Sequence, residues 1–174
     1  MREIGYGTPG EENMHLVLVD DEAAILDVLA AACTADGHTV TAFRSSQEAL
    51  SYLQANSTDL LITDIVMPPP DGFRLVSAAR KVQPHMGAIL VTGYTQRYAL
   101  EDVLACGAAD LLFKPFRLHE LRARVRLAEE RRRMMLEHLQ LLREAKVPAH
   151  DELRREADEL RSALASASPR KTKE

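Results

Sequence analysis

The feature that most constrains the fold of this chain is a regular alternation of short apolar runs with longer amphipathic segments between residues 15 and 113. The apolar runs are rich in Val, Ile and Leu on both faces, and we predict strands at 15–19, 38–43, 59–63, 87–92 and 109–113. Apolar residues at helical spacing predict helices at 22–36, 45–56, 72–82 and 96–107. Strands without a polar face belong to a parallel sheet that helices cover on both sides. We therefore expect an α/β fold built on a doubly wound, five-stranded parallel sheet.

The net charge and the spacing of apolar residues change near Phe116. Residues 1–116 carry 7 basic and 15 acidic side chains, a net charge of −8, whereas residues 117–174 carry 15 and 11, a net charge of +4. The second part also continues with helical spacing far beyond what a domain-closing helix needs. We expect four regions: a flexible lead-in at 1–13, an α/β domain at 14–126, a helical coiled-coil extension at 127–166 and a disordered tail at 167–174.

Composition excludes several classes of protein. No run approaches the roughly 18 apolar residues of a membrane span, and the polar N-terminal segment lacks the apolar core of a secretory signal. We expect a cytoplasmic protein with no membrane partner. Cys33 and Cys106 are far apart within apolar helical patterns, without further ligands at metal-binding spacing, so we predict two buried thiols.

Polar residues follow or close four of the predicted strands. In a doubly wound sheet the ligand site lies at the carboxyl ends of the strands. The residues there are Asp20, Asp21, Glu22, Asp64, Thr92, Gly93 and Lys114. A single aspartate at such a place is often only a helix cap, but capping does not account for all of these residues at one edge. Carboxylates held this close repel unless a cation is present, and hard oxygen ligands suit Mg²⁺.

Four motifs give the chain a family resemblance. They are "LVDDE", "TDIVMPPPDGF", "VTGYT" and "GAADLLFKPF", in that order. With them, residues 14–126 resemble the response-regulator receiver domain of bacterial two-component signalling, a CheY-like domain with a flavodoxin-like fold. The resemblance implies that Asp64 accepts a phosphoryl group from a sensor histidine kinase or a phosphotransfer protein. It also implies a signalling protein and not an enzyme, apart from self-catalysed phosphoryl transfer and hydrolysis.

The same resemblance assigns the metal ligands. Mg²⁺ is expected on Asp21, Asp64 and the backbone carbonyl of Val66, with Asp20 orienting a water of the metal. Val66 also argues against an alternative class of protein, the phosphatases with an aspartate nucleophile. These enzymes usually carry a second aspartate two residues after the first, where this chain has Val66.

The resemblance further assigns Lys114 to a phosphoryl oxygen and Thr92 to a second oxygen once the phosphate is present. Pro115 implies a cis peptide after Lys114. Receivers usually carry an aromatic residue three positions before this lysine, which moves between exposed and buried positions on phosphorylation. Leu111 stands there in this chain. Because leucine has no hydroxyl group to move between water and core, the usual aromatic readout is in doubt.

The segment beyond Phe116 has two seven-residue apolar stripes. With position a at Leu118, the stripe comprises a = Leu118, Val125, Arg132, Leu139 and Lys146, and d = Leu121, Ala128, Met135 and Leu142. The second stripe comprises Leu127, Met134 and Leu141. A lone helix would leave both in water, so we predict a homodimer through the C-terminal helices. Pro148 is expected to break the helix before the pattern resumes.

Other interpretations of this segment remain open. It could be a linker to an output domain, or the receiver could be a phosphorylation-independent scaffold that binds through its helices. Direct nucleic-acid binding is disfavoured because acidic residues interleave with the arginines and no helix-turn-helix pattern is present. His119, within "HELR", resembles the phosphoaccepting box of histidine kinases. Its place at the start of a receiver helix predicts an ordinary surface residue instead, as for His138.

Overall fold

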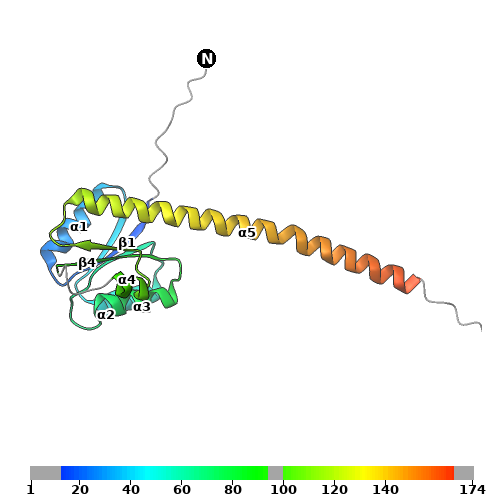
Figure 1. The fold of residues 1–174 in the computed structure, drawn as a ribbon, viewed down its shortest axis with the longest axis horizontal. Coiled ribbons are helices and arrows are strands. Elements are labelled where there is room, and N and C mark those ends of the chain that lie inside the picture. The colour runs from blue at the N-terminus through cyan, green and yellow to red at the C-terminus, as the bar shows by residue number, and fades with distance from the viewer. Residues whose placement is uncertain (1–12, 94–99, 167–174) are drawn as a thin grey trace, which may run out of the picture. The chain divides into compact units, whose positions relative to one another are not determined.

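A computed structural model describes the backbone of residues 13–93 and 100–166, with side chains for 13–93 and 101–144 (Figure 1). The expected lead-in, apart from Asn13, and the expected tail at 167–174 lie outside these residues. None of the helices in the described part of the chain combines the length and hydropathy that crossing a bilayer requires.

Five parallel strands form one sheet, as the apolar runs predict. The strands are β1 (His15–Val19), β2 (Thr39–Phe43), β3 (Leu60–Asp64), β4 (Gly87–Thr92) and β5 (Asp110–Phe113). Their order is β2-β1-β3-β4-β5, and every neighbouring pair is parallel. The chain moves outward in one direction through β2 and in the other through β3, β4 and β5. The strand order therefore reverses beside β1 and β3, where such sheets bind ligands.

Helices cover both faces of the sheet (Figure 1). They are α1 (Ala23–Ala35), α2 (Ser46–Ala55), α3 (Gly72–Val82), α4 (Leu100–Cys106) and α5 (Leu118–Ser166). One apolar core joins the sheet to α1 and to Leu121 and Val125 of α5. A second core joins the other face to α2, α3 and α4. This three-layer arrangement confirms the doubly wound fold.

Local sequence fixes several helix ends. The Ser45 side chain accepts a hydrogen bond from the Glu48 N–H and caps α2. Gly107 follows α4 with a φ of 85°, the left-handed conformation expected at a helix C-terminus. The predicted start of this helix falls among residues 94–99, outside the described residues, and α4 begins at Leu100.

The chain divides into two compact units, Met1–Arg132 and Arg133–Glu174. Within the first unit, arginines of α5 form ion pairs with aspartates of the α/β domain. The pairs are Arg122–Asp36 at 2.7 Å, Arg124–Asp110 at 2.8 Å and Arg132–Asp59 at 2.7 Å. Arg132 interrupts the apolar a stripe in the sequence, and its ion pair with Asp59 gives it a role in holding α5 on the domain.

The second unit contains the remainder of α5, which continues without interruption to Ser166. The expected break at Pro148 is therefore wrong. A proline inside a helix loses one backbone hydrogen bond, at a cost of about 3 kcal/mol. The long runs of helical spacing on both sides of Pro148 offset this cost. Several apolar side chains of this unit are exposed, namely Met134, Met135, Leu136, Leu141 and Leu142.

Candidate functional site

The predicted site residues meet at the carboxyl edge of the sheet. Asp64 closes β3 and Thr92 closes β4, whereas Asp20 and Lys114 directly follow β1 and β5. The sequence placed them together because all five strands run in the same direction. Asp20, Asp64 and Thr92 are buried, with 1%, 7% and 0% of their surface exposed. Asp21 is half-buried.

Three carboxylates form a cluster at this edge. One carboxylate oxygen from each of Asp20, Asp21 and Asp64 lies within 4.8 Å of the others. Mg²⁺ ligands lie about 2.1 Å from the ion in octahedral geometry, which separates them by roughly 3–4 Å. The donors are hard oxygens and nearly at this spacing, so the residues present fit the ion. Val66, two residues beyond Asp64, is 40% exposed, and its carbonyl ligation stays a prediction.

Lys114 partly neutralises this cluster. Its Nζ donates to Asp20 Oδ2 at 2.7 Å and to Asp64 Oδ2 at 3.3 Å, and lies 3.9 Å from Glu22. Burial lowers the pKa of Lys114, but the hydrogen bonds and charges of Asp20 and Asp64 outweigh this effect and leave the pKa above its usual value. Lys114 is therefore a cation held between two carboxylates.

Asp64 has different partners at its two oxygens. Oδ1 accepts the N–H of Ile65 at 2.8 Å, and Oδ2 faces Lys114. Burial raises the pKa of Asp64, Lys114 lowers it, and the nearby Asp20 charge raises it again, for a net increase. The buried carboxylate is thus less stable in its charged form than a free one, and a further cation would favour ionisation.

The start of α3 packs directly against Asp64. A Cβ added to Gly72 would collide with the Asp64 carbonyl oxygen, so only glycine allows this approach. Gly72 donates its N–H to Ile65 O at 3.1 Å, and the Asp71 side chain caps α3 through the Arg74 N–H at 2.8 Å. The sequence analysis predicted neither role, although Asp before a helical run is a capping signal.

The neighbouring loops carry the other expected features. The Lys114–Pro115 peptide is cis, as the resemblance implies, and Pro69–Pro70 is cis as well. The Lys114 N–H donates to Thr92 O at 2.7 Å, which ties the ends of β4 and β5 together. Among residues 13–93 and 101–144, no atom lies within 4 Å of a Cβ added to Gly93. Leu111 is half-buried against the core that contains α2, α3 and α4.

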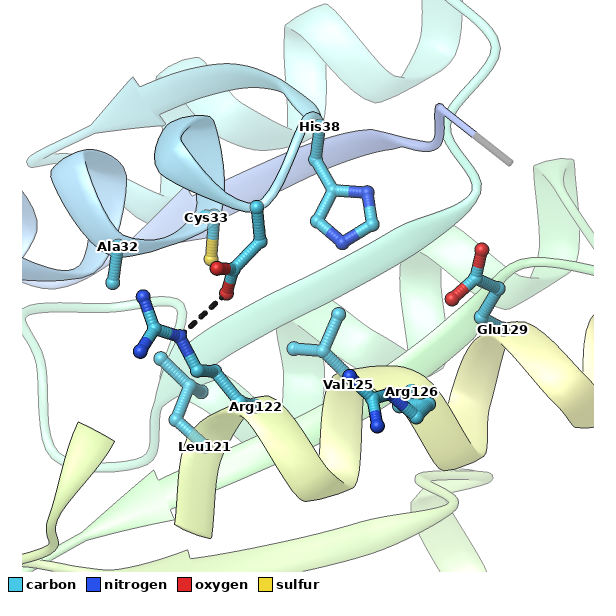
Figure 2. A pocket seen from close by; sticks show the side chains of 9 residues that line it. Ala32, Cys33, His38, Leu121, Arg122, Val125, Arg126 and Glu129 are labelled. Carbon is cyan, nitrogen blue, oxygen red and sulfur yellow. Dashed lines mark hydrogen bonds and ion pairs between the residues drawn. The ribbon is translucent and has the colours of Figure 1, made fainter. Parts of the chain in front are cut away.

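A separate cavity of about 70 Å³ lies between α1 and α5 (Figure 2). Figure 2 shows Cys33 on its α1 wall, Leu121 and Val125 on α5, and the ion pair of Arg122 at its rim. Burial raises the pKa of the Cys33 thiol to about 11, so it is protonated and unreactive at neutral pH. The cavity shares no residue with the acidic cluster.

The predictions for two cysteines and two histidines are confirmed. Cys33 and Cys106 are free and buried. His119 and His138 are exposed on α5, as expected of surface residues.

The fold and the cluster together define a doubly wound α/β domain, with three carboxylates and a lysine at the edge of the sheet where the strand order reverses. The chain belongs to the response regulator receiver domain family, which it matches over residues 16–126. It is 34% identical over 128 residues to the C4-dicarboxylate transport transcriptional regulatory protein DctD of Rhizobium meliloti, covering 74% of this chain and 28% of that protein. It is also 34% identical over 111 residues to response regulator SaeR of Staphylococcus aureus, covering 64% of this chain and 48% of SaeR. The chain thus spans less than half the length of these relatives.

Solved structures of receiver domains have the same fold as this chain. A CheY-like response regulator receiver domain protein from Methanospirillum hungatei has a TM-score of 0.66 at 27% identity, covering 71% of this chain and 98% of that one. A response regulator receiver domain protein from Clostridium thermocellum is 29% identical with a TM-score of 0.63, covering 70% and 98%.

Proposed function

We propose that this chain is a cytoplasmic response regulator that accepts a phosphoryl group on Asp64 from a sensor histidine kinase or a phosphotransfer protein, in a Mg²⁺-dependent reaction. The observation that carries the proposal is the setting of Asp64. It ends β3 beside two further aspartates and receives a hydrogen bond from a lysine that follows β5. Membership of the receiver family supports the same function.

The proposed chemistry is a simple displacement. An Asp64 carboxylate oxygen donates an electron pair to phosphorus, the phosphorus–nitrogen bond of phosphohistidine breaks, and that electron pair stays on the imidazole. The product is an aspartyl phosphate. A carboxylate nucleophile needs no general base, so the chain's main task is to orient Asp64 and balance charge. Mg²⁺ held by Asp21, Asp64 and the Val66 carbonyl, with Asp20 orienting a water of the metal, would neutralise charge on the phosphoryl oxygens.

Lys114 and Thr92 would receive the phosphoryl group. Lys114 is already hydrogen-bonded to Asp64 Oδ2 and would transfer that hydrogen bond to a phosphoryl oxygen. Thr92 lies at the end of the neighbouring strand, and its hydroxyl would donate to a second oxygen. Phosphorylation adds a charge of about −1.5 to −2, which would change the balance that Lys114 maintains with Asp20.

The proposed output is through α5. Its exposed apolar side chains in the second unit support a homodimer between C-terminal helices. Direct DNA binding receives little support, because Arg122, Arg124 and Arg132 already pair with aspartates of the receiver domain. The conformational change that follows phosphorylation would then act on the helices or on a partner protein.

Incubation with a small phosphodonor and Mg²⁺ tests this function. The intact protein should gain the mass of one phosphoryl group, and the gain should disappear when EDTA replaces Mg²⁺ or when the chain carries Asp64→Asn. A wild-type chain that gains no phosphoryl group, yet still forms dimers, would favour the phosphorylation-independent scaffold.

A further inference from the structure

Residues 43–46, from the last residue of β2 to the first residue of α2, contact the loop that carries Asp20 and Asp21. The Asp20 N–H donates to the carbonyl of Phe43 at 3.2 Å. Arg44 donates two hydrogen bonds, from Nε at 3.2 Å and Nη2 at 3.1 Å, to the backbone carbonyl of Asp21. Because a guanidinium group that donates twice to one oxygen has a defined orientation, Arg44 restrains the backbone of Asp21 from the neighbouring strand end.

The same segment contacts the loop that follows Asp64. Ser46 Oγ donates to the carbonyl of Pro68 at 3.2 Å, and Ser46 has only 3% of its surface exposed. The preceding Ser45 caps α2, so the first residue of this helix is fixed where Ser46 meets the loop. The side chains of Arg44 and Ser46, two positions apart, thus contact the two loops that carry the carboxylates.

We infer that Arg44 and Ser46 are positioning residues, which hold the Asp20–Asp21 loop and the 65–70 loop at the separation that a divalent cation requires. This inference rests on the proposed Mg²⁺-dependent function. Neither side chain has to touch the ion. Hydrogen bonds to the backbone next to metal ligands orient those ligands, and losing them commonly weakens metal affinity by about tenfold or more.

Because Arg44 is charged, the direction in which Arg44→Ala changes the Mg²⁺ affinity tests the inference. A guanidinium beside a cluster of carboxylates repels an incoming cation, so electrostatics alone predicts that Arg44→Ala binds Mg²⁺ more tightly. Positioning predicts the opposite, because the Asp21 backbone loses both of its hydrogen bonds to Arg44. The two effects can therefore be separated in one measurement on the metal-binding equilibrium, without any phosphoryl transfer.

Arg74 provides a matched control. It is exposed in the first turn of α3, the helix that begins beside Asp64, and its side chain forms no hydrogen bond or ion pair with the described part of the chain. Arg74→Ala removes the same charge near the same end of the sheet without removing a contact to either loop. Arg44→Lys keeps the charge at position 44 but cannot donate through two nitrogens to the Asp21 carbonyl.

Isothermal titration of the full chain with Mg²⁺ is the test, together with hydrogen exchange of the Glu22 amide in the absence of metal. This amide donates to Asp20 Oδ1 at 2.9 Å and reports on the order of the loop. We expect the Mg²⁺ dissociation constant to rise about tenfold in Arg44→Ala and less in Arg44→Lys. It should rise about threefold in Ser46→Ala, which loses one hydrogen bond, and stay within about twofold in Arg74→Ala. Glu22 exchange should accelerate in Arg44→Ala.

Other results would overturn the inference. If Arg44→Ala binds Mg²⁺ as tightly as the wild type or more tightly, the hydrogen bonds of Arg44 do not position Asp21 for the ion and the positioning role is wrong. If Arg44→Ala does not fold, Arg44→Lys and Ser46→Ala provide the test. Mg²⁺ dissociation constants equal to that of the wild type in both variants would reject the inference. A wild-type chain that does not bind Mg²⁺ rejects the proposed function as well, so the two failures can be told apart.

Discussion

The ammonium nitrogen of Lys114 lies 2.7 Å from Asp20 Oδ2, although the two residues are 94 positions apart in the chain. The contact joins the ends of β1 and β5 across the carboxyl edge of the sheet. It places a half-buried cation between carboxylates that would otherwise repel each other, since Asp64 Oδ2 lies 3.3 Å from the same nitrogen. The stability of this edge without metal therefore depends on Lys114.

Lys114→Met should destabilise the metal-free protein at pH 7 by about 2–4 kcal/mol, because it leaves buried carboxylates without their cation. Mg²⁺ should restore much of this loss by taking over the charge compensation. Urea unfolding with and without Mg²⁺ measures both effects. Lys81→Met, at an exposed position in the last turn of α3, is the control and should have little effect. Equal losses for the two variants would contradict the role of Lys114.

The raised pKa of Asp64 predicts a dependence of stability on pH. A carboxyl group whose pKa is higher in the folded than in the unfolded state favours folding while it is protonated. This contribution is complete below the unfolded-state pKa of about 3.9 and is lost as pH rises through the raised pKa. Asp64→Asn, which cannot ionise, should therefore melt at a higher temperature than the wild type at pH 7 without metal. The difference should vanish near pH 3–4, and a difference that grows toward low pH would refute this explanation.

Gly72→Ala should disturb the site more than its small size suggests. The added methyl group would collide with the backbone of Asp64, so β3 or α3 must shift. We expect a loss of about 1–3 kcal/mol in unfolding free energy, together with weaker Mg²⁺ binding. Gly93→Ala adds the same methyl group where the described part of the chain has no atom within 4 Å, and thermal unfolding should show little change. Equal stability of the two variants would mean that α3 does not need its close approach to Asp64.

Two double variants test the proposed dimer. Met135→Gln with Leu142→Gln changes the last two d positions of the first stripe, whereas Met134→Gln with Leu141→Gln changes the last two residues of the second stripe. All four side chains are exposed, so neither change should unfold the receiver domain. Light scattering should find monomers for the first variant and a smaller shift toward monomers for the second. If both variants keep the wild-type mass per particle, these stripes do not form the contact.

Much of the fold follows from the sequence for a physical reason. Strands buried on both faces must be apolar throughout, so the runs that became β1 and β4 are visible without any structure. Because parallel strands all end at one edge, the same alternation predicts that Asp20, Asp64 and Lys114 meet. The cluster could therefore be predicted as a consequence of topology, before any distance was known.

Other features depend on geometry that periodicity does not contain. The Arg44 contact to the Asp21 carbonyl joins two loops whose separation is set by the packed sheet. In the sequence, Arg132 is a charged residue in an otherwise largely apolar stripe. The ion pair with Asp59 of the receiver domain explains why an arginine stands there, and helical spacing does not predict this contact. The rule that a proline ends or kinks a helix predicted a break at Pro148, but α5 continues through this residue. The free energy lost with one hydrogen bond does not outweigh that of the whole long helix.

The central claim is that Asp64 is the phosphoryl acceptor, and mapping the phosphorylated residue tests it most directly. The protein would be incubated with a small phosphodonor and Mg²⁺, the acyl phosphate trapped by borohydride reduction, and the peptides sequenced by mass spectrometry. We predict modification at Asp64, and its persistence in Asp71→Asn, because asparagine caps α3 as well as aspartate does. Modification at His119 or at another carboxylate, with Asp64 unchanged, would contradict this account.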